Sequence, residues 1–342
     1  LNRLVSWVDT NLNHEEKDKL NLHIKDRRRV VRKIQSTLKS KPVFALFGAS
    51  QVGKSYLIKN ILSSKGVSLK INSGKEEYDF LEDINPPGTG AESTGVVTRF
   101  TIDNPSPNPE YPVKISLLNP KDLIIILCDS YFSDIESIIG YPDKDQFVEH
   151  LSDLKKHYQN SNIKQNNFIE DDVLDIKNYF ETHFKSNYLL VKSISESNYW
   201  LVISGLIENI PSNKWCSVFE ILWGKNPQIS NLFTLLINEL EYISFEKCVF
   251  APFSSVLRKQ GEILDVKRLE EISLNTQKIS ILVSDKEKEV NISRLSALSA
   301  ELVLQISGDI HKEKKFLENT DLFDFPGARS RLSLKTPENI DE

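Results

Sequence analysis

The sequence predicts an α/β protein in which a three-layer domain with a mixed sheet is interrupted by a mostly α-helical subdomain. Three observations lead to this fold class. An apolar run, a glycine-rich loop and an amphipathic segment predict a strand, a turn and a helix over residues 42–62. Strand-like patterns follow at 96–102 and 111–118, and they return as a hairpin over 278–293. Between these sheet-forming parts, residues 120–275 have mainly helical patterns.

The boundaries between these parts follow from changes in composition. Pro42 ends the first helical stretch, and Asn119-Pro120 has the features of a helix start. A further helix is expected over 294–306. We therefore expect an N-terminal helical segment (1–40), the first part of the sheet domain (41–118), a helical insertion (119–275) and the returning part of the sheet domain (276–342).

The glycine-rich loop matches the G-x-x-x-x-G-K-[ST] pattern of phosphate-binding P-loops. Its glycines let the backbone approach an anion, which successive N–H groups and a helix N-terminus would hold. Lys54 would reach the β- and γ-phosphates, and the Ser55 hydroxyl would bind Mg²⁺. A chance match in a structural turn is the alternative, but the flanks have the strand and helix patterns that the chemistry needs. The predicted nucleotide-binding residues of this loop are Gly48, Ser50, Gln51, Val52, Gly53, Lys54 and Ser55.

Composition limits the class of protein. The chain has 342 residues, 39% hydrophobic and 27% charged, which fits about two globular domains. Its longest apolar run, Leu123–Cys128, is far shorter than the ~18 residues of a transmembrane helix. No basic segment followed by an apolar one begins the chain, and three widely spaced cysteines do not suggest a disulfide framework. We expect a cytoplasmic protein without an evident membrane element, and export as a secreted effector stays open. The net charge of -5 makes broad nucleic-acid binding unexpected.

A basic run lies in the first helical segment, between Lys25 and Lys33. Two interpretations apply. The run is either the solvated face of a helix that packs against the nucleotide domain, or a patch for anionic lipid or nucleic acid. We favour the first, because charge runs on helices are usually exposed faces.

Two aspartates are candidates for the carboxylate that accompanies a P-loop. Asp324 follows a short strand, and Gly327 completes an Asp-x-x-Gly sequence, in which the aspartate holds Mg²⁺ and the glycine N–H contacts the γ-phosphate in GTPases. Asp129 ends the apolar run Ile124–Cys128, as in the Walker-B strand of ATPases. We favour Asp324, because a helix cap precedes the second run and no glycine follows Asp129.

Two motifs give a resemblance to known proteins. Thr94-Gly95-Val96-Val97-Thr98-Arg99 resembles switch I of dynamin-like GTPases, and Asp324-Phe325-Pro326-Gly327 resembles their Asp-Leu-Pro-Gly. Together with Asn85-Pro86, these motifs look closer still to the bacterial virulence-factor family often called SrfC-like. The resemblance implies that Lys54 and Ser55 bind phosphate and Mg²⁺, that Thr98 closes switch I, and that Asp324 and Gly327 form switch II.

The sequence also differs from these GTPases at several positions. Ser50 and Gln51 stand in the reverse of the dynamin order, and Ala328 replaces the glutamine of Ras-like enzymes after the switch II glycine. Arg329 could supply positive charge to a transition state, with Arg331 as the alternative and a surface role as the simpler one. No guanine-reading Asn/Thr-Lys-x-Asp motif follows Gly327.

The function expected from the sequence is a nucleotide-dependent switch of a virulence-associated protein. It would bind GTP (or ATP) with Mg²⁺, hydrolyse it slowly, and act through a protein partner or self-association. The first alternative is a scaffold that binds nucleotide without turnover. The second is an ATPase or small-molecule kinase that uses Asp129.

Overall fold

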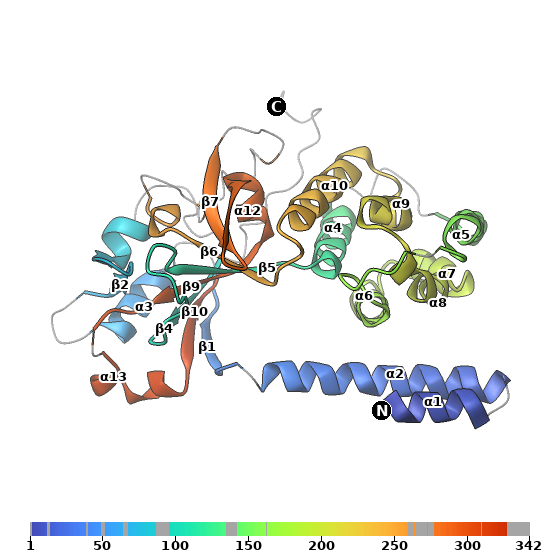
Figure 1. The fold of residues 1–342 in the computed structure, drawn as a ribbon, viewed down its shortest axis with the longest axis horizontal. Coiled ribbons are helices and arrows are strands. Elements are labelled where there is room, and N and C mark those ends of the chain that lie inside the picture. The colour runs from blue at the N-terminus through green and yellow to red at the C-terminus, as the bar shows by residue number, and fades with distance from the viewer. Residues whose placement is uncertain are drawn as a thin grey trace. The chain divides into compact units, whose positions relative to one another are not determined.

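The computed structural model describes residues 2–11, 14–38, 40–48, 52–63, 68–86, 96–134, 142–161, 163–258, 263, 272, 277–308 and 310–326. It is a mixed α/β protein that divides into two compact units (Figure 1). Unit 1 contains Leu1–Lys41 and Gly140–Gly224, and unit 2 contains Pro42–Ile139 and Lys225–Glu342. The chain therefore passes between the units three times.

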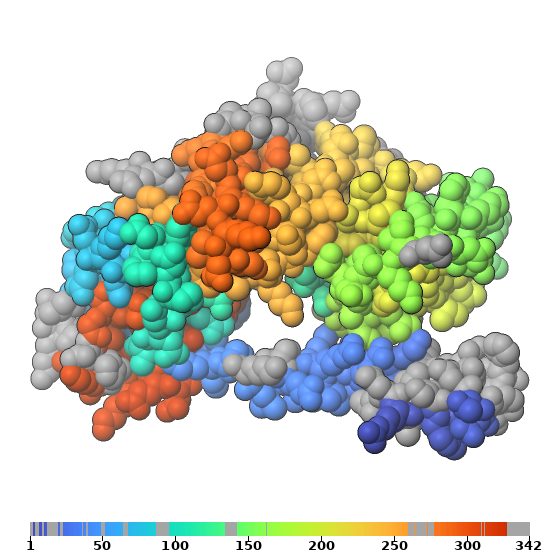
Figure 2. Space-filling view, viewed as in Figure 1, coloured from blue at the N-terminus to red at the C-terminus, as the bar shows by residue number. Residues whose placement is uncertain are grey.

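Unit 2 is built on a mixed sheet of eight strands in the order β1-β10-β4-β9-β5-β6-β7-β8, with a separate two-stranded hairpin, β2–β3. β1 is parallel to β10 and β4 is parallel to β9, whereas the other neighbouring pairs are antiparallel. The expected mixed sheet is thus confirmed. In the space-filling view, orange residues near the end of the chain lie against teal residues numbered around 100–115 (Figure 2). The strands are β1 (Val43–Leu46), β2 (Lys70–Asn72), β3 (Glu77–Asp79), β4 (Val97–Thr101), β5 (Val113–Leu117), β6 (Cys248–Ala251), β7 (Lys278–Val283), β8 (Lys286–Asn291), β9 (Ser299–Gln305) and β10 (Asp321–Asp324).

One end of this sheet brings together residues that are far apart in the sequence. Because β1 and β10 are parallel and β4 runs the other way, the carboxyl ends of β1 and β10 meet the amino end of β4. Leu46 lies opposite Asp324, which in turn lies opposite Thr98. The glycine loop that follows β1 therefore starts beside the last residue of β10.

Helix α3 (Lys54–Leu62) covers one face of the sheet at this end. It packs on β10 and on the π-helical turn η1 (Phe80–Ile84). Ile58 and Leu62, four positions apart and therefore on one helix face, are fully buried. The ring of Phe80 lies edge-on to that of Phe100, with 4.9 Å between centroids. The strand and the helix predicted over residues 42–62 are confirmed, while residues 49–51 of the loop between them lie outside the described residues.

The opposite face of the same strands carries a partly buried ion-pair cluster. Arg99 on β4 donates from Nε to Oε1 of Glu301 on β9 at 2.7 Å, and from Nη1 to Oδ2 of Asp321 on β10 at 3.0 Å. Its guanidinium lies 4.6 Å from the ring centroid of Phe323. Burial disfavours the guanidinium charge, but the two carboxylates outweigh it and raise the pKa of Arg99 above its ordinary value. The cluster links three neighbouring strands.

Strand β9 corrects one sequence prediction. The helix expected over 294–306 ends at Leu298, where β9 begins. β9 lies between β4 and β5. Its three consecutive residues Leu302, Val303 and Leu304 are all buried, whereas a strand with one exposed face has buried and exposed residues in alternation. A strand covered on both faces has a continuous apolar run, which periodicity cannot distinguish from a buried helix.

The remaining helices of unit 2 include α10, which packs against α4 and α12. α10 begins at Pro227, and the side chain of Asn226 accepts hydrogen bonds from the N–H groups of Gln228 and Ile229, as an N-cap does. Arg294 of α12 pairs with Glu239 of α10 at 3.2 Å. These helices and short turns are α4 (Pro120–Asp134), α10 (Pro227–Tyr242), η6 (Phe253–Ser255), α12 (Ile292–Leu298), α13 (Ile310–Glu313) and η7 (Lys315–Glu318).

Unit 1 is helical and has an aromatic core. Trp215, Trp223 and Tyr199 are fully buried and Trp200 is 4% exposed, so the tryptophans of this region form a core. The polar ends of two of them are satisfied, because Trp215 Nε1 donates to the Ile210 carbonyl at 3.0 Å and Tyr199 Oη donates to a backbone carbonyl at 2.8 Å. The elements are α1 (Asn2–Asn11), α2 (His14–Thr37), α5 (Lys144–Tyr158), α6 (Glu170–His183), α7 (Tyr188–Glu196), α8 (Tyr199–Leu206), η3 (Ile207–Asn209), η4 (Ser212–Lys214), α9 (Trp215–Phe219) and η5 (Glu220–Trp223).

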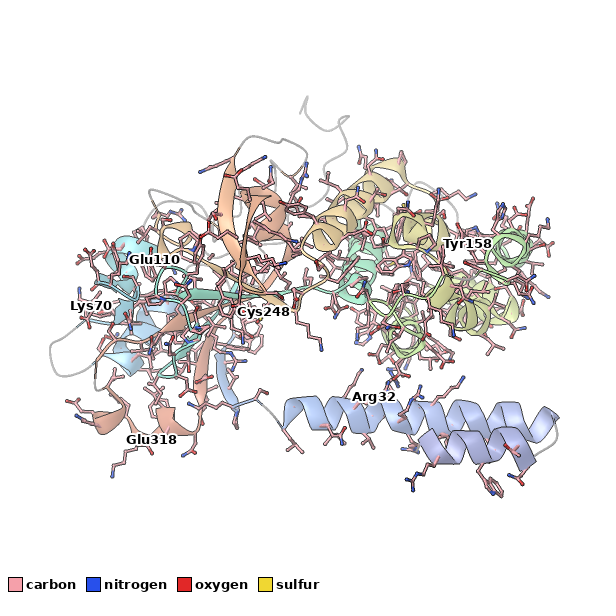
Figure 3. The ribbon with its side chains drawn as sticks, viewed as in Figure 1. Arg32, Lys70, Glu110, Tyr158, Cys248 and Glu318 are labelled. Carbon is pink, nitrogen blue, oxygen red and sulfur yellow. The ribbon has the colours of Figure 1, made fainter. Side chains whose placement is uncertain are left out.

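Five bases of the run in α2 pair with acids of α6, although Arg32 and Lys33 stay about half exposed and Arg27 is exposed, so the expectation of a solvated face is corrected only in part. Its side chains recur every three or four positions and so share one face, and Arg32 points from α2 toward α6 (Figure 3). The shared carboxylates are Asp171 and Asp175. The pairs are Lys25–Glu170 (2.6 Å), Arg28–Asp171 (2.8 Å), Arg29–Asp175 (2.6 Å), Lys33–Asp175 (2.9 Å) and Arg32–Asp171.

None of the helices in the described part of the chain is both long and apolar enough to span a bilayer.

Candidate functional site

Gly48 and Gly53 both lie between β1 and α3. Gly53 has a left-handed conformation (φ 87°, ψ 21°) immediately before Lys54 opens α3. Glycine adopts this conformation without the steric cost that a side chain brings. At Gly48, a Cβ would lie 3.3 Å from Cγ2 of Val52, so the loop closes on itself. The first N–H groups of α3, which have no intrahelical acceptor, are thereby placed at this loop.

The side chain of Lys54 folds back over the loop. Its Nζ donates a hydrogen bond to the carbonyl oxygen of Gly48 at 3.0 Å. The ammonium group and the positive end of the α3 dipole therefore contribute positive potential at one place. Such a place favours an anion.

The Ser55 hydroxyl is at the centre of a hydrogen-bond chain that joins three elements. Ser55 Oγ on α3 donates to Oδ2 of Asp324 on β10 at 2.7 Å. Asn85, which follows η1, donates from Nδ2 to Ser55 Oγ at 3.1 Å. Asp324 and Asn85 are buried, at 1% and 5% exposed. The chain of bonds links residues separated by 269 positions in the sequence.

Thr98 lies at the same end of the sheet as Ser55 and Asp324. It lies on β4 directly opposite Asp324 and is 1% exposed. Opposite residues of an antiparallel pair point to the same face, so the hydroxyl of Thr98 and the carboxylate of Asp324 lie on the α3 side of the sheet. Arg99, the next residue, belongs to the other face.

Burial raises the pKa of Asp324 above its ordinary value, because the carboxylate has lost its contact with water. The hydrogen bond from Ser55 and the positive charge of Lys54 act in the opposite direction without cancelling this effect. A cation bound beside Asp324 would favour its ionised form.

Two aromatic rings connect the loops that follow β1 and β10. Phe47 and Phe325 stack with 4.3 Å between their centroids, and Phe323 packs edge-on against Phe325 at 5.7 Å. Phe47 comes immediately before Gly48, and Phe325 comes immediately after Asp324. The stack therefore holds the starts of the two loops side by side.

The side chains at this end of the sheet carry the type of ligand atom that a hard cation prefers. The hydroxyls of Ser55 and Thr98 and the carboxylate of Asp324 are oxygen ligands, and Mg²⁺ is commonly held by one or two carboxylates together with phosphate and water oxygens. Within the described ranges, no group of three or more His, Cys, Asp or Glu side chains is arranged to hold a metal ion. A cation at Asp324 would therefore need oxygen ligands from a bound phosphate or from water.

The alternative that used Asp129 is wrong. Residues Ile124–Cys128 lie within helix α4, which begins at Pro120, and not on a sheet strand. A Walker-B carboxylate ends a strand beside the one that leads into the phosphate loop. In this protein β10 has that position next to β1, and Asp324 ends it.

The predicted site residues fall into two groups. Ser50, Gln51, Gly327 and Arg329 lie outside the described residues, as does the Gly88–Gly95 loop. The others are brought to the same end of the sheet: Gly48, Val52, Gly53, Lys54, Ser55, Thr98 and Asp324.

Asn85 is a member of this site to which the sequence assigned no role. Asn85-Pro86 contributed to the family resemblance, and the segment before it gives a structural signal, because Asp79 caps the turn η1 by accepting from the N–H groups of Leu81 and Glu82. A turn fixed in this way projects the next polar side chain in a defined direction. The contact with Ser55, 30 positions away, depends on the tertiary fold.

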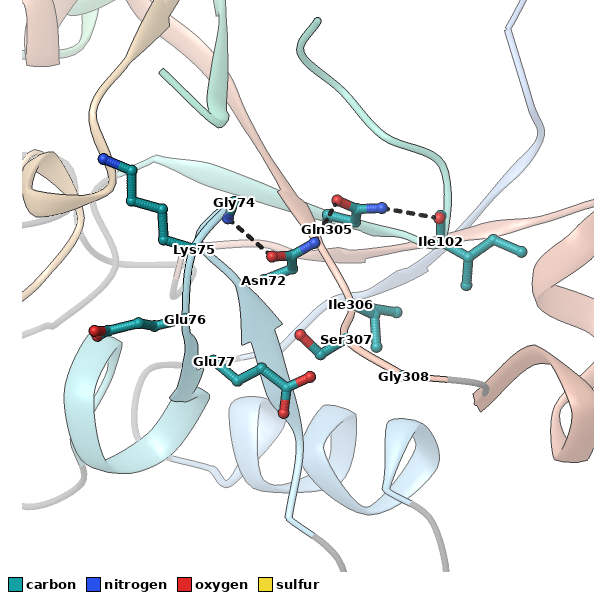
Figure 4. A pocket seen from close by; sticks show the side chains of 10 residues that line it. All are labelled: Asn72, Gly74, Lys75, Glu76, Glu77, Ile102, Gln305, Ile306, Ser307 and Gly308. Atoms are coloured by element: carbon teal, nitrogen blue, oxygen red, sulfur yellow. Dashed lines mark hydrogen bonds between the residues drawn. The ribbon is translucent and has the colours of Figure 1, made fainter. Parts of the chain in front are cut away.

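A polar cavity of about 440 Å³ lies at the other end of the sheet (Figure 4). Asn72 Nδ2 donates to Gln305 Oε1 at 3.0 Å across its floor. Since Gln305 ends β9 and Ile102 follows β4, the strand directions place this cavity away from Ser55. It is separate from the loop site.

The fold and the site define a mixed α/β protein with a buried hydroxyl–carboxylate pair beside a glycine loop. Residues 5–342 match the model of the family described as "Putative bacterial virulence factor". The chain belongs to this family. Among curated proteins, none matches the chain.

Proposed function

We propose that this protein is a Mg²⁺-dependent nucleotide switch that binds GTP (or ATP) and hydrolyses it slowly. The observation that carries the proposal is the 2.7 Å hydrogen bond from Ser55 Oγ to Asp324 Oδ2. It joins the second residue of the helix after the glycine loop to the carboxylate at the end of the neighbouring parallel strand. Phosphate-bound Mg²⁺ needs a hydroxyl and a carboxylate in this relation.

Phosphate binding would use the loop and the start of α3. The Gly48 and Gly53 positions allow close backbone approach, and Lys54 would exchange its bond to the Gly48 carbonyl for a phosphate oxygen. The motif and its flanks support this role. The pattern alone can also match by chance, but the Asp324 contact is an independent observation.

Magnesium would supply charge neutralisation between the β- and γ-phosphates. Ser55 and Asp324 would orient it, Asp324 either directly or through water. Thr98 would add a third oxygen from the strand opposite, and Gly327 would contact the γ-phosphate through its N–H. The resemblance to dynamin-like switch regions supports the last two assignments.

Hydrolysis is expected to be slow. Ala328 stands where Ras-like enzymes have the glutamine that orients water, and Arg329 is the candidate for positive charge in the transition state. Ala328 also favours a second candidate function, a scaffold that binds nucleotide without turnover. Measuring phosphate release under saturating GTP and ATP separates the two.

The decisive experiment is equilibrium binding of GTP and ATP to wild type, Lys54→Ala and Lys59→Ala. Lys59 lies in the last turn of the same helix, beside Tyr56, and serves as a matched control. Loss of Lys54 should weaken binding about 10- to 100-fold, because a hydrogen bond to a charged group contributes about 1.5–3 kcal/mol. Lys59→Ala should bind as wild type does. Equal affinities in all three proteins, or no binding by wild type, would refute the proposal.

A further inference from the structure

We propose that Asn85 is a positioning residue that fixes the Ser55 hydroxyl for a divalent cation. This inference rests on the proposed function and assigns a role that neither the motifs nor the family carries. It depends on the geometry of three side chains: Asn85, Ser55 and Asp324.

The chemistry of a serine hydroxyl makes this arrangement specific. The oxygen has one proton and two lone pairs. Ser55 gives its proton to Asp324 at 2.7 Å and accepts the Asn85 N–H at 3.1 Å. These two bonds fix the rotation of the hydroxyl, and one lone pair remains for a metal ion. Without Asn85, the oxygen would keep one fixed direction instead of two.

The identity of the donor follows from the same geometry. An asparagine amide can present either its oxygen or its NH₂ group, and the assignment depends on the hydrogen-bond partners. The Ser55 proton is directed at Asp324, so the Asn85 atom that faces Ser55 Oγ must donate. A neutral donor is suited to this place, because a second carboxylate would repel Asp324 and a bound phosphate.

The backbone holds Asn85 firmly. Its N–H donates to the Phe80 carbonyl at 2.8 Å and closes the π-helical turn η1. π-Helical turns are rare and occur frequently at functional sites. Phe80 is buried against Phe100 of β4, the strand that carries Thr98. Asn85 is therefore fixed to the sheet by a route that does not pass through α3 or the glycine loop.

The experiment is a Mg²⁺ titration of GTP binding to wild type, Asn85→Ala and Asn72→Ala. Outer-shell partners of metal ligands commonly change metal affinity 10- to 100-fold. Asn85→Ala should therefore raise the half-saturating Mg²⁺ concentration at least about tenfold, with nucleotide affinity in EDTA unchanged. Asn72 belongs to the β2–β3 hairpin that precedes η1 and bonds Gln305 instead of Ser55, so Asn72→Ala should titrate as wild type does.

Two further variants make the result specific. Asn85→Leu keeps the volume of the side chain without the donor, and it should reproduce the Mg²⁺ effect if Asn85→Ala folds poorly. In a Ser55→Ala background, Asn85→Ala should have no additional effect on the Mg²⁺ titration, because its action passes through Ser55. Thermal unfolding of each protein verifies that the variants are folded.

Several outcomes would overturn the inference. It fails if wild type and Asn85→Ala have the same Mg²⁺ dependence, or if Asn85→Ala weakens nucleotide binding equally in EDTA. It also fails if the Asn85 effect persists without the Ser55 hydroxyl. Absence of nucleotide binding by wild type would instead refute the proposed function, so the two failures are distinguishable.

Discussion

The charged groups of the two units are arranged in opposite ways. In unit 1, five bases of α2 each pair with a carboxylate of α6, namely Lys25, Arg28, Arg29, Arg32 and Lys33. In unit 2, Asp324 is more deeply buried, yet its bonded neighbour is the neutral hydroxyl of Ser55. Lys54, the cation that acts on it, bonds the Gly48 carbonyl.

This difference separates structural charges from candidate functional ones. A charge whose counter-charge belongs to the same unit stabilises the packing of two elements. Among the described residues, no base forms a salt bridge with Asp324, so a cation bound beside this buried carboxylate would favour its ionised form. The Arg99 cluster on the other face of the same strands belongs to the first kind. Alternation along β4 and β10 therefore places one kind of charge on each face of the sheet.

The largest effect on stability is expected for Arg99→Ala. Its removal leaves Glu301 and Asp321 buried without their cation, and breaking such a pair typically costs about 3–5 kcal/mol. The free energy of opening, measured by hydrogen exchange in peptides of β4, β9 and β10, should fall by about 3 kcal/mol. Lys114→Ala on the neighbouring strand β5 is the control, with less than about 0.5 kcal/mol expected. If Arg99→Ala lowers the free energy of opening by less than about 1 kcal/mol, the cluster contributes no more to stability than exposed ion pairs do.

A smaller effect is expected for Asp175→Ala in unit 1. Asp175 accepts from Arg29 and Lys33, and its loss should cost unit 1 about 1–2 kcal/mol at low salt, because Arg29 keeps its pair with Asp26 and Lys33 is exposed. All four tryptophans belong to unit 1, so denaturation followed by tryptophan fluorescence reports this unit. The difference from wild type should shrink as salt is added. A salt-independent difference would contradict an ionic origin.

Asp324→Asn should stabilise the fold at pH 7, whereas the two substitutions above should destabilise it. The folded-state pKa of Asp324 is raised, so its contribution to stability is present below the unfolded pKa of about 3.9 and is lost as pH rises through the folded value. The asparagine variant should therefore unfold at a temperature a few degrees higher at pH 7, and this advantage should vanish near pH 4. Calorimetry across this range without nucleotide measures the difference. A variant less stable than wild type at pH 7 would show that the ionised carboxylate is already satisfied.

The smallest effect is expected for Lys156→Ala. Its pair with Asp153 is 70% and 63% exposed and lies three positions apart on α5. Exposed pairs of this kind contribute about 0.3–0.5 kcal/mol or less. Tryptophan fluorescence should show almost no change in the unfolding midpoint of unit 1. A loss comparable to that of Asp175→Ala would remove the distinction between exposed and partly buried pairs.

Local signals predicted the parts of the fold that depend on neighbours in the sequence. The strand, glycine loop and α3 were predicted from a motif with its flanks, and Asp324 was preferred over Asp129 because a helix start precedes the latter. β9 was missed because Leu302, Val303 and Leu304 do not alternate in a strand that is covered on both faces.

The remaining errors involve contacts between distant segments. The basic run of α2 has the sequence pattern of a solvated face, because the α6 carboxylates that pair with it lie more than 130 positions later in the chain. The contact of Asn85 with Ser55 likewise has no sequence signal, because only the fold brings α3 to the Asn85 side chain. Neither partner can be identified from one sequence, because the pairing is a property of the tertiary fold.

The pairing of α2 with α6 also sets an order of events during synthesis. Arg28 and Asp171 are 143 positions apart, and ribosomes add about 5–20 residues per second. The basic face of α2 therefore leaves the ribosome roughly 7–30 seconds before its carboxylates exist. In that interval β1, α3 and β4 are made, while β10 is the last strand of the described residues to be synthesised. The ion pairs of α2 therefore form only after α6 is made, and the β1–β10 pairing forms only after the strand that carries Asp324 is made.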